Sequence, residues 1–137
     1  MIAAISTANK VEHLFFQPKA INQHSFCDFL IEFRKKIGNE KVVLFMDQLA
    51  VHATEKVKEK YDELQFETVM NVKYMPDFNP IETVFAHVKR WYQRERLQLL
   101  ANKQDYDTKA LIRKAFKRIP ETLVERSIAR SLRLINS

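Results

Sequence analysis

The sequence predicts a mixed α/β domain that ends in a helical extension. Short apolar runs typical of strands alternate with segments of helical period, and no linker rich in Pro, Gly or Ser separates them. The expected order is strand, strand, helix, strand, helix, strand and then three helices. We expect the mixed part to cover residues 1–101, and a basic helical extension, packed on it or on a partner, to cover 102–137. The length of 137 residues fits one domain.

The first half of the chain contains three expected strands and one helix. Residues 2–7 and 11–17 have the composition of two strands joined by a short polar turn. Residues 22–37 carry apolar side chains at helical spacing, and Gly38 is a suitable residue to end that helix. Residues 42–46 are all apolar, which is typical of a strand buried on both faces. The three strands therefore belong to a sheet that is antiparallel at first and parallel afterwards.

A lysine- and glutamate-rich helix over residues 55–64 follows, with Thr54 as its expected N-cap. Residues 66–70 have the pattern of another strand, and 71–79 are expected to form a loop.

Three helices are expected in the remainder of the chain. Pro80 is favourable at the first helical position and Asn79 just before it, which predicts a long helix over about 80–101. Helices near 107–118 and 121–135 follow. The last is amphipathic, which suits docking. One of its faces carries Arg126, Arg130 and Arg133, and another carries Val124, Ile128, Leu132 and Ile135.

Composition excludes several classes of protein. The single cysteine, Cys27, excludes an internal disulfide framework and any multi-cysteine zinc site, and its apolar neighbours indicate a buried position. The single glycine, Gly38, excludes glycine-rich phosphate loops. No apolar run approaches the roughly 18 residues of a membrane span, and the start at Met1 is a poor signal peptide. We therefore expect an intracellular protein without a membrane partner.

The positive charge is concentrated near the C-terminus. Residues 1–83 carry 10 Lys or Arg and 12 Asp or Glu, a net charge of −2, whereas residues 84–137 carry 13 and 5, a net charge of +8. Such a bias is typical of a solvated helical face or of a surface for phosphates. The candidate DNA-binding residues are Lys89, Arg90, Arg94, Arg96, Arg113, Lys114, Lys117 and Arg118.

Two carboxylates stand at positions where α/β proteins usually bind ligands or carry catalytic residues. Asp47 follows the apolar run 42–46, and Glu82, with 34 residues between them, falls in the first turn of the long helix. Two such oxygen ligands suit Mg²⁺. The alternative is structural: Asp47 caps a turn, and Glu82, three residues after Asn79, stabilises the helix start. For His52 the alternatives are a ligand or a base, but it is expected to pack or to form a turn. Trp91 and Tyr92 are expected to belong to the core rather than to stack on a base.

The segments VVLFMDQLAVH, from Val42 to His52, and YMPDFNPIE, from Tyr74 to Glu82, resemble the catalytic domain of mariner-type transposases. That family belongs to the DDE superfamily and has an RNase H-like fold. The resemblance covers roughly residues 1–95. It implies that Asp47 is the second acid of the catalytic set and that His52 is the family's His a few residues on. It also implies that Glu82 ends the motif Asn-Pro-Ile-Glu and that Lys89 is the helix lysine.

The resemblance also implies an incomplete catalytic set. The family uses three acids, and the first lies on a strand upstream of the segment matched by Met1–Ser6. The acids before Asp47 are Glu12, Asp28, Glu32 and Glu40, none of them at the end of such a strand. Gln48 replaces the usual Asn, and the family's N-terminal DNA-binding helices have no counterpart, which predicts an N-terminally truncated domain.

We therefore expect a domesticated, transposase-derived pseudoenzyme that binds weakly and non-specifically to DNA, serves as a subunit of a nuclear protein complex and needs no cofactor. The alternative is an active Mg²⁺-dependent endonuclease whose first acid comes from elsewhere. A third interpretation is protein interaction without nucleic acid.

A missing central strand also leaves a gap in the expected sheet. It can be closed by pairing Met1–Ser6 with Val42–Met46, by a strand from a partner chain, or by Met1–Ser6 itself being the central strand.

Overall fold

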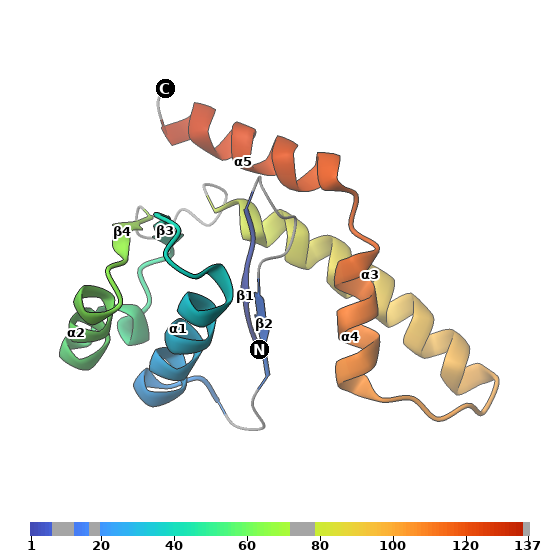
Figure 1. The fold of residues 1–137 in the computed structure, drawn as a ribbon. Helices are drawn as coiled ribbons and strands as arrows, with labels where there is room; N and C mark the ends of the chain where they lie inside the picture. Colours follow the sequence, from blue (N-terminus) through green and yellow to red (C-terminus); the bar gives the residue numbers. More distant parts are fainter. Residues whose placement is uncertain (7–12, 17–19, 72–78, 136–137) are drawn as a thin grey trace. The chain divides into compact units, whose positions relative to one another are not determined.

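The computed structural model describes residues 1–6, 13–16, 20–71 and 79–135. The chain divides into two compact units (Figure 1). The first unit consists of Met1–Ala3 and Glu12–Asn79, and the second consists of Ala4–Val11 and Pro80–Ser137. Among the described helices, none is both long enough and apolar enough to cross a lipid bilayer.

The described strands form two separate two-stranded sheets. β1 (Ile2–Ala4) pairs with β2 (His13–Phe15), and β3 (Val43–Met46) pairs in parallel with β4 (Glu67–Met70). The four strands confirm the segments expected from the sequence, with shorter bounds. Parts of the expected strands 2–7 and 11–17, and most of the loop 71–79, lie outside the described residues. Among the described strands β1 does not pair with β3, so the direct closure of the sheet is wrong, and so is the central placement of Met1–Ser6.

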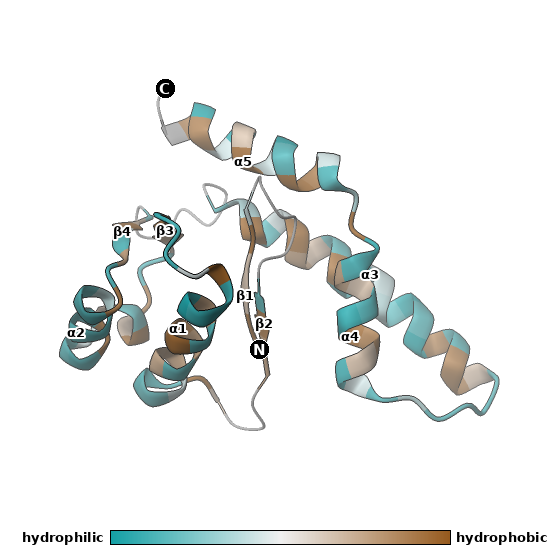
Figure 2. Cartoon of the chain, in the orientation of Figure 1, coloured by the Kyte–Doolittle hydropathy of each residue, from teal (hydrophilic) through white to brown (hydrophobic). Residues whose placement is uncertain are grey.

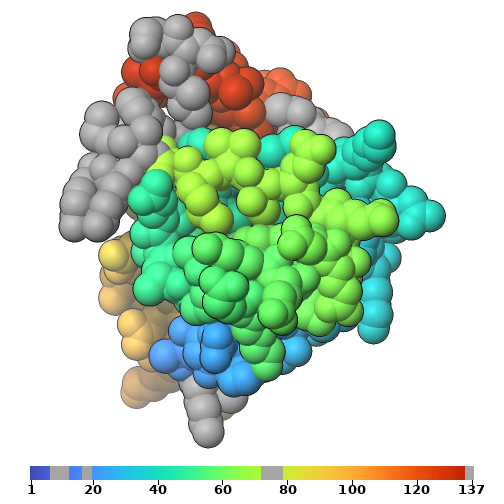
Figure 3. Space-filling view, turned by 90° about the vertical axis from the view of Figure 1, so that its left-hand side faces the viewer, coloured from blue at the N-terminus to red at the C-terminus, as the bar shows by residue number. Residues whose placement is uncertain are grey.

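The expectation that residues 42–46 are buried on both faces is also wrong. Val43 is 57% exposed, and Val69, opposite Phe45 in the parallel register, is 49% exposed. Side chains two apart on a strand share a face, so Val43, Phe45 and Val69 lie on the same face of the pair. Figure 3 shows α2 (Glu55–Glu63) and β4 at the surface. An apolar run therefore shows that a strand forms, but not that both of its faces are covered.

Helix α1 (Gln23–Ile37) begins and ends as the sequence predicts. The Ser25 backbone N–H donates to Asn22 Oδ1 at 3.0 Å, and the Asn22 N–H donates to Ser25 Oγ at 2.9 Å, so the two residues cap the helix reciprocally. At the other end Gly38 has a φ of 65°, and its N–H donates to the Arg34 carbonyl at 3.0 Å. A residue without Cβ adopts this conformation at little cost.

Aromatic side chains form the core of the first unit. Phe26, Phe29 and Phe33 point from one face of α1 and stack in sequence, with centroids 5.8 and 5.9 Å apart, and Phe33 stacks on Phe66 at 5.8 Å. All four are buried. Burial of each phenylalanine contributes about 1.5–3 kcal/mol, and each well-oriented ring pair adds about 0.5–1.5 kcal/mol. The spacing of these residues is the periodicity from which the helix was predicted.

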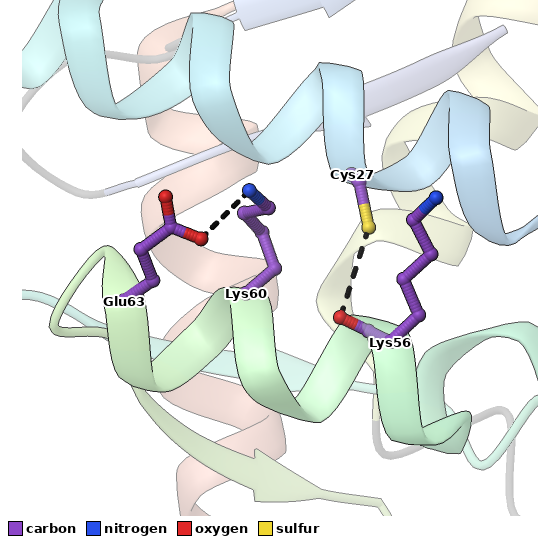
Figure 4. Close-up of polar contacts among 4 residues, drawn as sticks. All are labelled: Cys27, Lys56, Lys60 and Glu63. Carbon is purple, nitrogen blue, oxygen red and sulfur yellow. Dashed lines mark hydrogen bonds and ion pairs between the residues drawn. The ribbon is translucent and has the colours of Figure 1, made fainter.

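Helix α2 packs against α1 through small and aromatic side chains. Thr54 caps it as expected, accepting from the Val57 N–H at 3.3 Å, and Val57 and Tyr61 are buried. Cys27 of α1 is buried as predicted, with its Sγ 4.0 Å from the Lys56 carbonyl oxygen (Figure 4). The rest of α2 is hydrophilic (Figure 2). A short 3₁₀ turn, η1 (Ala50–Ala53), precedes α2 and was not predicted.

The second unit contains α3 (Pro80–Ala101), α4 (Thr108–Lys117) and α5 (Glu121–Ile135), close to the expected bounds. α3 packs against both α4 and α5. Val84 and Val88 of α3 are buried, and Phe85 meets Phe116 of α4 edge-to-face at 6.3 Å. The Asp107 carboxylate accepts from the Lys109 N–H at 2.9 Å and caps α4.

The buried face of α5 differs from the expected apolar row. Val124 is buried as predicted, but Leu132 is 55% exposed, whereas Ser127 and Ser131 are buried. Ser127 satisfies its hydroxyl by donating to the Leu123 carbonyl at 2.7 Å. Small residues allow close approach of packed helices, so the serines occupy the contact stripe and Leu132 lies beside it. Arg126, Arg130 and Arg133 are all exposed.

Candidate functional site

Asp47 lies at the carboxyl end of the parallel pair β3–β4. It is half-buried and directly follows Met46, and Asn71 directly follows β4 at the same edge. The Asn71 N–H donates to the Met46 carbonyl at 2.6 Å, and Asn71 Nδ2 donates to Asp47 Oδ1 at 2.8 Å. Parallel pairing therefore brings an acid and an amide together where α/β sheets usually place their ligands.

His52 contacts the main chain of Asp47. Its Nδ1 lies 2.8 Å from the Asp47 carbonyl oxygen, which only accepts hydrogen bonds, so Nδ1 carries the proton. The imidazole packs against Phe26, with centroids 4.6 Å apart. The Tyr61 hydroxyl donates to the His52 carbonyl at 2.9 Å, and burial raises the pKa of Tyr61. His52 thus has the packing and turn role expected of it.

Glu82 belongs to the second unit. It is exposed in the first turn of α3, two residues after Pro80, and the buried Asn79 precedes that helix. Asp47 belongs to the first unit, so a cation site shared by these two acids stays a prediction. Within the described ranges, no three His, Cys, Asp or Glu residues gather closely enough to hold a metal ion.

The donor types around Asp47 fit a hard cation. A carboxylate and a neighbouring side-chain amide offer oxygen atoms, which Mg²⁺ prefers over nitrogen or sulfur. The Asn71 amide nitrogen already engages one carboxylate oxygen, Oδ1, and so fixes the orientation of the group.

The eight candidate DNA-binding residues all lie in the second unit, and all are exposed. Four are on α3, three are on α4, and Arg118 follows α4. Arg96 Nε donates to the Tyr106 hydroxyl at 2.7 Å, which raises the pKa of Arg96 and keeps it charged. The Arg118 guanidinium lies 5.3 Å from the centre of the Trp91 ring. Trp91, expected in the core, is only half-buried, and its ring makes a cation–π contact with this guanidinium.

Sequence analysis missed Asn71 as a partner of Asp47. The available signal was positional: Asn71 follows the predicted strand 66–70 as Asp47 follows 42–46. Arg34 was missed as well. Its guanidinium stacks 4.1 Å from the centre of the Phe66 ring. It also donates to the carbonyls of Gly38, Glu40 and Gln65 at 3.1, 2.9 and 3.2 Å.

Comparisons with known proteins identify the family. The family described as DDE superfamily endonuclease matches residues 1–102. No curated protein matches the sequence. The Mos1 transposase catalytic domain with raltegravir and Mg is similar in structure, with a TM-score of 0.65 and 16% identity over 88% of this chain. This chain spans 64% of that Mos1 chain.

Two further Mos1 structures are similar. The Mos1 strand transfer complex gives a TM-score of 0.65 and 17% identity, covering 88% of this chain and 36% of that chain. The catalytic domain of Mos1 mariner transposase gives 0.52 and 16%, covering 88% and 68%. At these identities the likeness concerns the fold, and the predicted RNase H-like mixed α/β class is confirmed. Because the family match covers most of its length, this chain belongs to the DDE superfamily endonuclease family.

Proposed function

We propose that this chain is a transposase-derived domain that associates with DNA and acts as a binding or scaffolding subunit of a larger nucleic-acid-modifying complex. The observation that carries the proposal is the set of exposed basic residues on α3 and α4, in a chain of an endonuclease family. The similar Mos1 protein is described in a strand transfer complex, which supports DNA as the ligand class.

The proposal holds that residues 1–137 do not cleave DNA by themselves. By the family resemblance Asp47 and Glu82 correspond to two of three acids, and the first has no counterpart among these residues. Only in an active chain does the resemblance assign these two acids to Mg²⁺, the ion named with the Mos1 catalytic domain. The bound ion would polarise a phosphate oxygen as a Lewis acid. Two carboxylates without a third bind it weakly, because ligand number and geometry set its affinity.

The test is incubation of the pure 137-residue chain with supercoiled and end-labelled DNA in Mg²⁺ or Mn²⁺. We expect DNA binding without nicking, because the carboxylate set is incomplete in this chain. Asp47→Asn is the control for contaminating nucleases, since a contaminant is unaffected by that change. Cleavage by the unaltered chain that Asp47→Asn abolishes would contradict the proposal.

That same outcome would support the second candidate, an active Mg²⁺-dependent endonuclease whose first acid is supplied elsewhere, such as by a second copy of this chain. The observation that favours this candidate is the hydrogen bond from Asn71, which keeps the Asp47 carboxylate in one orientation.

A protein partner is part of the proposal. Val43, Val69 and Leu49 are exposed apolar side chains of the first unit, and a strand supplied by another chain beside β3 would cover apolar surface and pair backbone groups. Pull-down of the native protein with identification of co-purifying subunits tests this. A chain that is recovered alone and is monomeric in gel filtration contradicts an obligate complex.

Nuclear localisation is proposed only as a consequence of DNA association.

A further inference from the structure

The orientation of the Asp47 side chain depends on the neighbouring strand. Asn71 is 2% exposed, and its main-chain bond to Met46 continues the β3–β4 ladder by one residue. Its position is therefore set by strand pairing rather than by a loop. The amide nitrogen of Asn71 faces Asp47 Oδ1, so the amide donates and the carboxylate oxygen accepts.

The main chain of Asp47 is held independently. Its carbonyl oxygen accepts from the Leu49 N–H at 2.9 Å and from His52 Nδ1 at 2.8 Å. The imidazole is fixed in turn by Phe26 on its face and by the bond from the Tyr61 hydroxyl to the His52 carbonyl. Both ends of the aspartate, backbone and carboxylate, are thus attached to residues of the first unit.

A buried amide at this position requires an explanation beyond packing. Leaving a buried polar group without a partner costs about 1–3 kcal/mol, and an apolar side chain of the same shape avoids that risk. Asn71 supplies one thing that an apolar side chain cannot: a donor that selects one rotamer of Asp47.

We infer that Asn71 and His52 are positioning residues that hold Asp47 in a fixed orientation for a divalent cation, an inference that rests on the proposed function of Asp47. Asn71 acts on the carboxylate and His52 acts on the backbone that carries it. Groups that orient a ligand affect metal affinity without touching the metal.

The first test measures Mn²⁺ binding to the 137-residue chain by the loss of the free-ion electron paramagnetic resonance signal. Asn71→Leu keeps the branching at Cγ and removes the donor, and we expect it to weaken binding about tenfold or more. Val57→Ala is the matched control, because it lowers the melting temperature of the same unit without contacting Asp47. Unchanged Mn²⁺ affinity in a folded Asn71→Leu variant overturns the role of Asn71.

Two substitutions separate the roles of the His52 ring. His52→Phe keeps the aromatic packing on Phe26 and removes the donor, whereas His52→Asn keeps a donor near the position of Nδ1 and removes the ring. We expect Mn²⁺ affinity to fall in His52→Phe and to recover in His52→Asn. The reverse order would show that only packing matters, and would overturn the role of His52.

A second measurement keeps this inference distinct from the proposed function. If the unaltered chain binds no Mn²⁺, or if Asp47→Ala binds it equally well, the proposed cation role of Asp47 fails. Hydrogen exchange of the Asn71 side-chain amide, followed by NMR, then tests the hydrogen bond between Asn71 and Asp47 on its own. Slower exchange in the unaltered chain than in Asp47→Ala upholds the positioning of Asp47 by Asn71, and equal exchange overturns it.

Discussion

Arg34 stabilises the first unit through its planar guanidinium rather than through charge alone. It donates to three carbonyls and stacks on Phe66, joining the end of α1 to the residue before β4. Lysine has neither the flat face nor the fork of donors needed for this arrangement.

We expect Arg34→Met to lower the free energy of unfolding by about 1–3 kcal/mol, because it removes charge-assisted hydrogen bonds and a cation–π contact. Arg34→Lys should recover only a small part of the loss. Urea unfolding followed by circular dichroism measures both. Lys35→Met is the control, since Lys35 is exposed on the same helix and should change stability little. Equal effects at positions 34 and 35 would contradict the role assigned to the guanidinium.

Burial makes the Cys27 thiol a pH-dependent element of stability. Its pKa is raised from 9.0, mainly by desolvation, against the opposing influence of Lys60 and Lys56. A thiol with a higher pKa in the folded state stays protonated there after the unfolded chain has begun to ionise. The contribution of the Cys27 thiol to the free energy of unfolding is therefore complete below pH 9 and is lost as the pH rises through the folded-state pKa.

Unfolding free energies measured from pH 8 to 11 should thus fall more steeply in the unaltered chain than in Cys27→Ala, whose side chain does not ionise. Burial also raises the pKa of Tyr61 above its ordinary value of 10.0. Tyr61 therefore adds a further decline in the unfolding free energy above pH 10 in both proteins. Parallel curves for the two proteins between pH 9 and 10 would show that the thiol contributes nothing.

At the scale of elements, α5 packs through its serines. Ser131 is 4% exposed and Leu132 is 55% exposed, although a hydropathy pattern favours the leucine for the contact. α3 and α5 pack together, and a larger side chain on the contact stripe must separate them.

Ser131→Leu is therefore expected to destabilise the second unit by about 1–3 kcal/mol through overpacking. Leu132→Ser, the matched control, should change stability by no more than about 0.5 kcal/mol. Thermal melts of the two variants provide the comparison. A stabilising Ser131→Leu would show that the apolar row expected from the sequence forms the contact.

The helices could be predicted because their signals are local. Thr54 and Pro80 mark helix starts by chemistry that acts within one turn, and the phenylalanine spacing in α1 identifies its buried face. The sheet could not be predicted to the same extent. Whether Val43 is covered depends on segments remote in sequence, and the apolar run that identifies a strand carries no information about them.

The same distinction applies to the candidate site. Asp47 could be predicted because it directly follows an apolar run, and the resemblance assigned its role. Its contact with Asn71 spans 24 residues and depends on the parallel register of β3 and β4. A register is a property of two strands together, so neither strand alone reveals the contact.

For the whole molecule, the distribution of charge decides how it meets DNA. The excess of positive charge lies in residues 84–137, and its members on α3 and α4 are exposed. Each phosphate contact releases a counterion, which lowers the slope of log K against log salt by about 0.9.

Changing Arg94, Arg113, Lys117 and Arg118 to Gln should reduce both the affinity for duplex DNA and the salt slope, the latter by up to about 3–4. The control changes Lys35, Lys36, Lys41 and Lys58, four exposed lysines of the first unit, and alters the net charge equally. Fluorescence anisotropy between about 50 and 200 mM salt measures both the affinity and the salt slope. Equal losses of DNA affinity in the two quadruple variants would mean that only net charge matters. They would contradict a specific role for the surface of α3 and α4.

The two compact units also differ in their intrinsic probes. The chain contains one tryptophan and one cysteine: Trp91 lies in the second unit beneath the Arg118 guanidinium, and Cys27 is buried in the first. Indole fluorescence therefore follows the unfolding of one unit, while the rate of thiol labelling follows the opening of the other, with no added dye or mutation. Recording both along a single denaturant titration shows whether the units lose their structure together or one after the other.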